Sequence, residues 1–263
     1  MSSKKFGHKL VSYAQNTEDI KLFGYFWNME QPGFYVDIGA NHATHDSVTK
    51  FFYVRGWSGI NIEPQKHLIK LLKAERPRDK NICTGISDKP GKLRFRQYES
   101  NGLSTFSTNL HASYETGYEQ VAVRYEESEL KLVTLQSILR KYAANKAINF
   151  LKVDVEGFEY NVIKSNDWKM FRPWVICVES TGADKRWQAI LEKAGYIRHI
   201  YDGLNDYYVA SEHENLIQNY RAFVASEVIR YDVANLPNMK FTQGLRDLKH
   251  GIAARKRKAK HAE

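Results

Sequence analysis

Short apolar stretches of strand character alternate with stretches of helical period along most of this chain. Buried strands are expected at Phe34–Ile38, Ser58–Ile62 and 148–153, and the segments between them carry apolar residues three and four positions apart, as helices do. Such an alternation brings successive strands together in parallel and lays the connecting helices on the faces of the sheet. The chain is therefore predicted to be an α/β protein with a mostly parallel sheet and helices on both faces.

The remaining predicted elements continue this alternation. Helices are predicted over 17–29, 45–55, Lys66–Glu75, Leu135–Tyr142, 158–165 and 185–194, and further strands over 81–86, 92–98, 121–125, 174–178, Tyr196–Tyr201 and 206–210. The last two strands flank the turn 202–205 and are predicted to form a hairpin. Residues 99–118 show no clear period and are predicted to form a long loop, which in a compact domain is usually functional or disordered.

The basic charge of the chain is concentrated at its C-terminal end. The net charge is +9, and residues 240–263 hold eight Lys and Arg against two Asp and Glu, which leaves +3 for the rest of the chain. Such a tail can bind nucleic acid or an anionic surface, or it can be a solvated end. We divide the chain into a domain at 1–212 and a C-terminal extension at 213–263 that ends in the basic tail.

The composition favours a cytoplasmic protein. No apolar run approaches the length of about 20 residues that crosses a bilayer as a helix, and the lysines near the N-terminus are not followed by the apolar region of a secretory signal. Cys83 and Cys177 are the only cysteines, and both lie in strand-like segments. They are predicted to be buried, reduced thiols.

A glycine turn, Asp37-Ile-Gly-Ala-Asn41, follows the first predicted strand. Gly39 would let a ligand approach the backbone closely, and the start of the next helix would offer unpaired amides. The turn lacks the pattern G-x-G-x-x-G and no P-loop lysine follows, which disfavours dinucleotides and triphosphates. An acidic side chain at this strand end, Asp37, would repel pyrophosphate but suits the ammonium and sulfonium groups of S-adenosylmethionine.

Polar side chains also follow the next two predicted strands. Glu63 ends the second strand about 20 residues beyond the glycine turn, where a carboxylate can accept both hydroxyls of a ribose. Ser87 and Asp88 follow the third strand and are placed to meet an adenine amino group. Glu63 can also be a surface acid at a strand end, and Asp88 also belongs to an ordinary turn sequence.

Three carboxylates are expected at one edge of the sheet. Asp154 and Glu156 leave the end of strand 148–153, and Glu179 leaves the next strand. Carboxylates so close together are costly unless a cation or a proton compensates them. The cluster therefore suits a general base, a divalent metal, or both. The alternative is that these acids only form ion pairs with Lys152, Lys164 or Arg172.

Four motifs occur in order along the chain. They are SYAQNTEDI at 12–20, FYVDIGAN at 34–41, GWSGINIEP at 56–64 and LKVDVEGFE at 151–159. Together they resemble the FkbM family of methyltransferases, and the resemblance runs from about residue 12 to 210. Thr17 departs from the pattern, because glycine is expected at that place.

This resemblance implies a Rossmann-like class I methyltransferase fold, with a seven-stranded, mostly parallel sheet and a final antiparallel strand. It implies S-adenosylmethionine as methyl donor and a hydroxyl as the usual acceptor. Members of the family often modify sugars of surface glycans or polyketide-type natural products.

The resemblance also implies cofactor-binding residues, which are Gln15, Asn16, Glu18, Asp37, Gly39, Ala40, Asn41, Glu63, Pro64 and Asp154. Segment 15–18 would fold back over the cofactor, and segment 37–41 would hold its methionine end. Glu63 would hold the ribose, and Asp154 would lie beside the reacting methyl group.

Methyl transfer to a hydroxyl is helped by a base that takes the hydroxyl proton. Asp154, Glu156 and His42 are the candidates, although a histidine near a helix start is more often a cap or a surface residue. Some sugar O-methyltransferases of the wider fold bind magnesium with acids from the fourth and fifth strand ends. Asp154 and Glu179 occupy corresponding places, so a divalent metal such as magnesium is a second candidate cofactor.

We therefore predict an S-adenosylmethionine-dependent O-methyltransferase that acts on a sugar hydroxyl in a surface glycan or polysaccharide and can associate with glycosyltransferases. A natural-product or RNA acceptor, and a non-catalytic scaffold module, stay open as alternatives. Nucleic acid is not expected as a partner, because only the basic tail argues for it, and that tail can also contact a membrane surface. The loop 99–118 has two possible roles: it is either a lid over the acceptor or a surface loop whose aromatic side chains are folded inward. The aromatic residues in and beside it are Tyr98, Phe106, Tyr114 and Tyr118.

Overall fold

The computed structural model describes residues 10–98, 104–107, 125–181, 184–226 and 231–233. Its helices are α1 (Glu18–Phe26), α2 (Val48–Tyr53), α3 (Lys66–Glu75), α5 (Leu135–Tyr142), α6 (Glu159–Lys164), α7 (Arg186–Lys193), the short 3-10 helix η2 (Ser211–His213) and α8 (Asn215–Ala225). Its strands are β1 (Leu10–Ser12), β2 (Phe34–Ile38), β3 (Ser58–Ile62), β4 (Lys80–Ile82), β5 (Gly85–Ile86), β6 (Gly91–Tyr98), β7 (Tyr125–Val133), β8 (Phe150–Val153), β9 (Val175–Glu179), β10 (Tyr196–Tyr201), β11 (Asn205–Ala210) and β12 (Tyr231–Val233).

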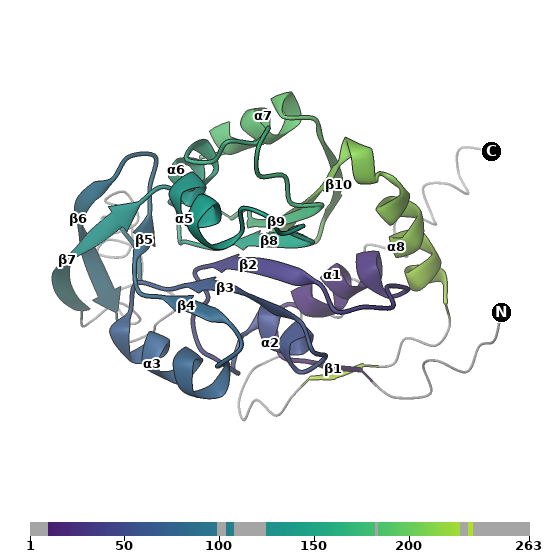
Figure 1. Cartoon of the computed structure of the whole chain (residues 1–263), viewed down its shortest axis with the longest axis horizontal. Coiled ribbons are helices and arrows are strands. Elements are labelled where there is room, and N and C mark those ends of the chain that lie inside the picture. Colours follow the sequence, from purple (N-terminus) through teal and green to yellow (C-terminus); the bar gives the residue numbers. More distant parts are fainter. Residues whose placement is uncertain (1–9, 99–103, 108–124, 182–183, 227–230, 234–263) are drawn as a thin grey trace. The chain divides into compact units, whose positions relative to one another are not determined.

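The central sheet has seven strands in the order β10-β11-β9-β8-β2-β3-β4 (Figure 1). The pairs from β9 through β4 are all parallel, and β11 alone runs antiparallel to its two neighbours. The predicted seven-stranded sheet with a final antiparallel strand is therefore confirmed. Strand order reverses between β2 and β8, which is where open parallel sheets bind ligands at the carboxyl ends of their strands.

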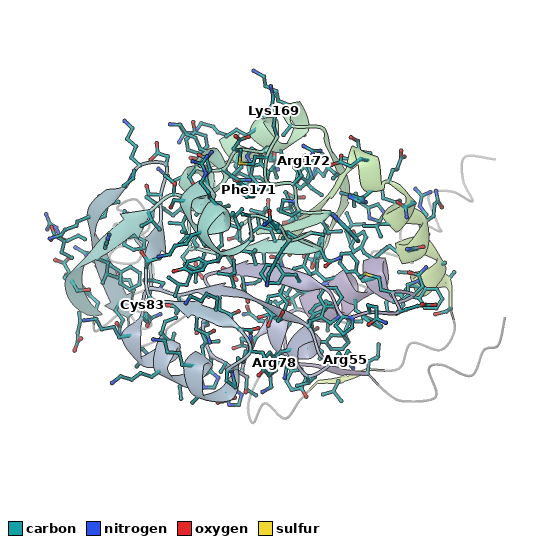
Figure 2. The ribbon with its side chains drawn as sticks, viewed as in Figure 1. Arg55, Arg78, Cys83, Lys169, Phe171 and Arg172 are labelled. Carbon is teal, nitrogen blue, oxygen red and sulfur yellow. The ribbon has the colours of Figure 1, made fainter. Side chains whose placement is uncertain are left out.

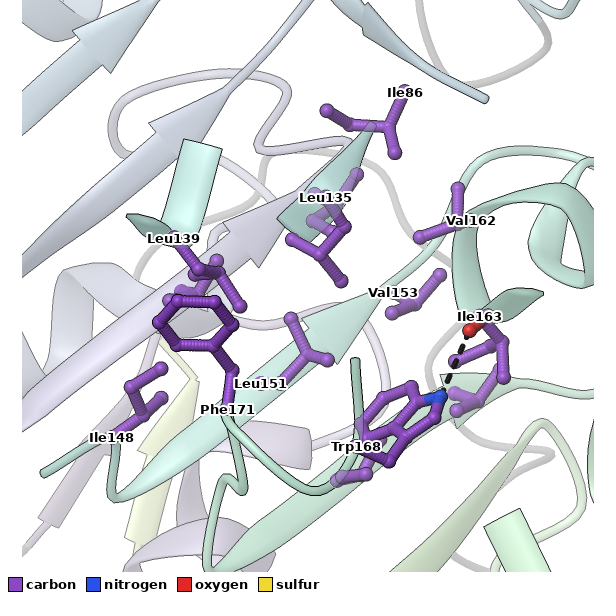
Figure 3. Close-up of a cluster of buried hydrophobic side chains, with 14 of the residues drawn as sticks. Ile86, Leu135, Leu139, Ile148, Leu151, Val153, Val162, Ile163, Trp168 and Phe171 are labelled. Atoms are coloured by element: carbon purple, nitrogen blue, oxygen red, sulfur yellow. Dashed lines mark hydrogen bonds between the residues drawn. The ribbon is translucent and has the colours of Figure 1, made fainter. Parts of the chain in front are cut away.

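Alternate side chains of the strands pack into two cores on opposite faces of the sheet. Val36 and Ile38 of β2 join a cluster with α5, α6 and α7, in which Trp168 donates an indole hydrogen bond to the carbonyl of Ile163 at 3.0 Å (Figure 3). Tyr35 of the same strand joins a cluster with α1, α2 and α8 on the other face. Arg55 and Arg78 lie beside α2, over the rings of Phe51 and Tyr53 (Figure 2). Helices thus cover both faces, as the sequence predicts.

The chain that follows β4 enters a second sheet, which has three strands in the order β5-β7-β6. The predicted strand 81–86 is therefore wrong as a single element, because its two ends join different sheets: β4 pairs with β3, and β5 pairs with β7. The predicted strand 121–125 is also wrong in extent, because β7 continues to Val133. Its glutamates disfavour a strand in isolation, but Glu127 and Glu129 lie directly opposite arginines of β6, so cross-strand charge pairing stabilises the strand.

Helix α2 begins at Val48, three residues later than predicted, because the segment before it is held in an irregular loop. Asn41 and Asp46 adopt left-handed backbone conformations with φ of 51° and 49°. The buried guanidinium of Arg76 donates to the carbonyl of Ala43 and to the side chains of Ser47 and Thr49. Arg76, the residue that follows α3, thus holds this loop in place by hydrogen bonds from its guanidinium.

Helix α8 packs against α1, and the compact unit that contains the sheet extends to Asp232. Gly24 of α1 permits this approach, because a Cβ there would lie 2.7 Å from the ring of Phe223. The boundary at residue 212 stays a prediction about where the methyltransferase domain ends.

Two observations bear on the predicted environment of the chain. None of the helices in the described residues is long and apolar enough to span a membrane. Both cysteines are free thiols, and Cys177 is buried as predicted, whereas Cys83 is exposed. Cys83 follows the last residue of β4, at the point where the predicted strand 81–86 breaks.

Candidate functional site

The glycine turn and the end of β8 touch at the point where strand order reverses. The amide of Asp154 donates to the carbonyl of Ile38 at 3.0 Å. Gly39 has φ of +78°, and a Cβ there would lie 1.7 Å from the carbonyl oxygen of Asp154. Glycine is therefore required because two strand ends meet at this position, a reason that the sequence alone does not show.

The amides of the glycine turn are already bonded to β3. Those of Gly39 and Ala40 donate to the carbonyl of Ile62 at 3.0 and 3.1 Å, and that of Asn41 donates to Glu63 Oε2 at 3.0 Å. The expectation of unpaired amides at a helix start is thus wrong here, because the helix begins only at Val48. The turn is a rigid connection between β2 and β3.

Asp37 lies beneath the turn and is fully buried. Its Oδ2 accepts a hydrogen bond from Thr49 Oγ1 at 2.7 Å, and its Oδ1 lies 3.7 Å from the ammonium of Lys152. Burial raises the pKa of Asp37, while Lys152 and Thr49 oppose that shift. The charge of Asp37 therefore faces Lys152 in this structure, and its direct contact with a cofactor stays a prediction.

Glu63 is buried at the end of β3, where its two carboxylate oxygens accept different backbone amides. Oε2 accepts from Asn41 at 3.0 Å and Oε1 from Gln65 at 2.9 Å. Burial raises the pKa of Glu63 to about 7, although these hydrogen bonds lower it. Pro64 continues the chain toward α3, and its carbonyl accepts from the thiol of Cys83. The structure brings Glu63 to the glycine turn, as the sequence predicts.

The opening motif reaches the carboxyl end of β9 through Glu18. This buried carboxylate accepts from Asn205 Nδ2 at 3.1 Å and from the amide of Asn16 at 2.8 Å. Asn205 is the direct cross-strand partner of Glu179. Glu18 and Asn205, 187 positions apart in sequence, are thereby placed at one edge of the sheet. Gln15, in the same motif, is exposed to solvent.

Asp154, Glu156 and Glu179 form the predicted acidic cluster. One carboxylate oxygen of each lies within 4.8 Å of the others. Burial, reinforced by the charge of Asp154, raises the pKa of Glu156 to about 9 and that of Glu179 to about 8. The three side chains are half-buried, and the cluster is the one group of its kind found among the described residues that could hold a metal ion.

Of the three cations offered as structural partners, only Lys152 contacts this cluster. Lys152 Nζ lies 3.1 Å from Asp154 Oδ2. Burial lowers the pKa of Lys152, but the charges of Asp154 and Asp37 outweigh that effect and raise it. The other two cations pair elsewhere, Lys164 with Asp88 and Arg172 with Glu212.

Ser87 and Asp88 follow β5 in the three-stranded sheet, where α6 holds Asp88 and β7 holds Ser87. Asp88 accepts from Lys164 Nζ at 3.0 Å and from Asn161 Nδ2 at 3.3 Å. The amide of the buried Ser87 donates to the carbonyl of Val133. Their contact with an adenine ring stays a prediction.

His42 is held as a local cap. Its Nδ1 accepts from the amides of Thr44 and His45 at 3.0 and 3.1 Å, so the neutral ring carries its proton on Nε2. Burial and the neighbouring His45 lower the pKa of His42, and the other charges acting on it come from outside the acidic cluster. This arrangement leaves His42 as a hydrogen-bond donor rather than an acceptor at the site.

Sequence reasoning missed the residues that hold the loop 155–158. Glu159 accepts from the amides of Val155 and Gly157 at 3.3 and 3.0 Å. Thr105 Oγ1 donates to the carbonyl of Glu156 at 2.5 Å. Glu159 lies inside the motif LKVDVEGFE, which was a signal for it, whereas Thr105 is about 50 residues away and nothing in the sequence points to it.

The proposed lid is only partly described. Tyr98 and Phe106 are buried, and Phe106 packs against Phe95 at 4.7 Å and Phe158 at 5.8 Å between ring centroids. These two aromatic side chains are thus folded inward, as the alternative to a lid predicts. Tyr114 and Tyr118 lie outside the described residues.

Comparison with known proteins gives one decisive match. The family described as "Methyltransferase FkbM domain" matches residues 37–207. No curated protein matches the chain. Among solved structures, precorrin-6y C5,15-methyltransferase from Geobacter metallireducens GS-15 is 11% identical with a TM-score of 0.36, over 80% of this chain and 95% of that chain, a likeness too distant to bear on the site. The family match covers the glycine turn, Glu63 and the whole acidic cluster, and the chain belongs to the FkbM family of methyltransferases.

Proposed function

We propose that this methyltransferase transfers the methyl group of S-adenosylmethionine to a sugar hydroxyl in a surface glycan or polysaccharide. Membership of the family accounts for the methyl transfer. One observation carries the choice of a hydroxyl: Asp154, Glu156 and Glu179 lie within 4.8 Å of one another, and the backbone of Asp154 touches the glycine turn. Carboxylates at this place can take the proton that a hydroxyl loses.

The donor side of the site fits S-adenosylmethionine at Glu63. Two backbone amides and the side chain of Gln65 already bond to this carboxylate. A carboxylate offers about four lone-pair positions, so a ribose hydroxyl can still be accepted. S-adenosylmethionine bound there supplies an electrophilic methyl group. The other proposed cofactor contacts are Gln15, Asn16, Glu18, Asp37, Gly39, Ala40, Asn41, Pro64, Ser87, Asp88 and Asp154.

On the acceptor side, the hydroxyl oxygen forms a bond to the methyl carbon as the bond from that carbon to sulfur breaks. The hydroxyl proton passes to Asp154. Glu156 is the second candidate base, and its raised pKa of about 9 means that it can take a proton only when a cation or a higher pH keeps it ionised. Holding the oxygen opposite the sulfur can contribute roughly 7–11 kcal/mol, and a positioned base about 10²–10⁴-fold. His42 is the third candidate base, and its Nδ1 is already used by backbone amides.

A divalent cation such as Mg²⁺ is proposed at Asp154 and Glu179, with Glu156 as a further ligand. Hard cations prefer carboxylate oxygens, and three such oxygens lie within 4.8 Å of one another. A cation bound there would help an acceptor hydroxyl lose its proton. If chelator-treated enzyme keeps full activity and added Mg²⁺ does not raise it, the proposed metal site is wrong.

The choice of a sugar rests on the resemblance of the four motifs to a family that often modifies surface glycans. This acceptor implies a cytoplasmic enzyme that works beside glycosyltransferases, with the basic tail at 240–263 available for an anionic membrane surface. A natural product as acceptor would leave the same residues in the same roles.

Mass spectrometry of surface glycans tests the proposal. Cells that carry the wild-type chain should contain a methylated sugar that is absent from cells carrying Asp154→Asn. Purified protein should bind S-adenosylhomocysteine, and its turnover should survive removal of residues 240–263. Glycans that are the same in both kinds of cell would show that the proposal of a sugar acceptor is wrong. Binding of RNA at modest salt would favour an RNA substrate. A protein that does not bind S-adenosylhomocysteine would favour the non-catalytic scaffold.

A further inference from the structure

Lys152 places a buried ammonium between two parts of the site. It lies on β8, directly opposite Asp37 of β2 on one side and Cys177 of β9 on the other. Its Nζ is 3.7 Å from Asp37 Oδ1, 3.1 Å from Asp154 Oδ2 and 3.5 Å from the carbonyl oxygen of Gly39. Only 7% of its side chain is exposed, so water cannot replace these partners.

This one cation therefore links the glycine turn to the residue proposed to meet the acceptor. Gly39 is the residue whose Cα packs against the carbonyl of Asp154, and Lys152 joins the same two residues through its ammonium. It contacts one carboxylate oxygen of Asp154, Oδ2, on the side of the carboxylate that faces the glycine turn. No other cation among the described residues forms an ion pair with Asp154 or Asp37.

We propose that Lys152 is a positioning residue for methyl transfer, whose ammonium fixes the carboxylate of Asp154 relative to the glycine turn. This inference rests on the proposed function of the site. It goes beyond that function by assigning a role to a side chain that acts through Asp154. The competing explanation is that Lys152 is only a counter-charge for the buried carboxylate of Asp37.

A set of four variants separates the two explanations. Lys152→Met leaves Asp37 buried without its cation, which is strongly destabilising, so this variant alone cannot decide. Asp37→Asn together with Lys152→Met removes both charges and should recover most of the stability. Asp37→Asn alone is the reference for the double variant, and Lys152→Arg keeps the charge with a different shape.

Arg172→Met is the matched control. Arg172 pairs with Glu212 and donates to the carbonyls of Trp168 and Ala194. It precedes β9, so it lies at the opposite edge of the sheet from the site. Its loss should lower the melting temperature and leave kcat and KM unchanged.

The positioning role predicts that stability and turnover separate. The double variant should melt close to Asp37→Asn, bind S-adenosylhomocysteine within about twofold of it, and show a kcat lower by about tenfold or more with little change in the KM for the donor. Lys152→Arg should recover part of the lost kcat. A double variant with the same kcat as Asp37→Asn would overturn the proposal and leave Lys152 as a counter-charge.

A crystal structure of the double variant with S-adenosylhomocysteine supplies a readout that needs no acceptor. The carboxylate of Asp154 should leave its wild-type position or occupy more than one conformer. A single, unmoved carboxylate would contradict the proposal even if turnover fell. Failure of the wild-type protein to bind S-adenosylhomocysteine would instead count against the proposed function, so the two failures are distinguishable.

Discussion

Within the described residues, four that are not glycine adopt left-handed backbone conformations, and three of these lie in the motifs that define the site. They are Thr17, Asn41, Asp46 and Glu156, with φ between 49° and 58°. This conformation costs roughly 1–2 kcal/mol for an L-residue, and such strain collects at functional sites. Thr17 has φ of 58°, so the departure noticed in the sequence falls where the backbone itself favours glycine.

Replacement of Thr17 tests this strain. Thr17→Gly should be more stable than Thr17→Ala by about 1 kcal/mol, because both lose the hydroxyl that donates to the Asn16 carbonyl but only glycine relieves the backbone. Urea unfolding of the two variants at one pH measures the difference. Equal stabilities would mean that the loop relaxes when the β-branched side chain is removed.

Asp19 should make stability depend on pH. This fully buried carboxylate accepts from Ser12 Oγ and from the amides of Tyr13 and Ile20. Burial raises its pKa from 3.8 to about 7. Between those values the folded state binds a proton that the unfolded state has lost, so the contribution of Asp19 to stability falls as pH rises through that range.

Asp19→Asn removes this titration. Urea unfolding at several pH values between 4 and 7 should show a smaller decline for the variant than for wild type. An identical slope would assign the decline to other groups.

Glu63 should make cofactor binding depend on pH near neutrality. Burial raises its pKa to about 7, and the ionised carboxylate accepts more hydrogen bonds from a ribose than the protonated form does. Affinity for S-adenosylhomocysteine should therefore increase as pH rises through about 7. Calorimetry on wild type and Glu63→Gln measures it, and a variant with the same pH dependence would remove Glu63 from the ribose site.

At the scale of elements, the short segment 104–107 connects the three-stranded sheet to the loop that carries Glu156. Residues 104–107 pair with β6 at Thr105 and Arg96. Thr105 then donates to the carbonyl of Glu156, next to Gly157 with φ of 84°. An element outside the central sheet thus stabilises the loop that carries one of the acidic residues.

Thr105→Val removes this hydrogen bond at nearly constant shape. The variant should lose about 1–3 kcal/mol of unfolding free energy, because the carbonyl of Glu156 loses a buried partner. Thr105→Ser keeps the hydroxyl and should stay closer to wild type. Chemical denaturation compares the two, and a Thr105→Val variant as stable as wild type would show that this hydrogen bond does not stabilise the fold.

At the scale of the whole molecule, α8 completes the core on one face of the sheet. Leu216, Ile217 and Phe223 are buried against α1 and α2 in the cluster that contains Tyr35 and Phe150. The side chains that close this core thus come from beyond residue 212.

Phe223→Ala should cost about 3 kcal/mol, as truncation of a buried aromatic residue does. Phe223 is 6% exposed and its neighbour Val224 is 57% exposed, so Val224→Ala is the matched control and should change stability by less than about 0.5 kcal/mol. Thermal unfolding measures both. Equal effects would mean that α8 is not part of the cooperative unit.

Local pattern alone determined much of the architecture of this protein. The bounds of β3, α3, α5 and β10 agree with prediction, because in each an apolar period ends at a glycine, proline or capping residue. Thr134 shows this directly, since its side chain accepts from the amide of Ser137 at the start of α5. The site residues at strand ends were predictable for the same reason, because a parallel sheet brings the carboxyl ends of its strands to one edge.

Only the tertiary structure decided what those residues do to one another. The split of 81–86 between two sheets, the length of β7 and the late start of α2 depend on partners far away in sequence, such as the arginines of β6 and Arg76. The same holds in the site, where Asp37 faces Lys152, the turn amides bond to β3, and Thr105 holds Glu156. Periodicity records which residues are buried, but the pairing of charges and hydrogen bonds depends on the distances between side chains, which only the assembled sheets and helices set.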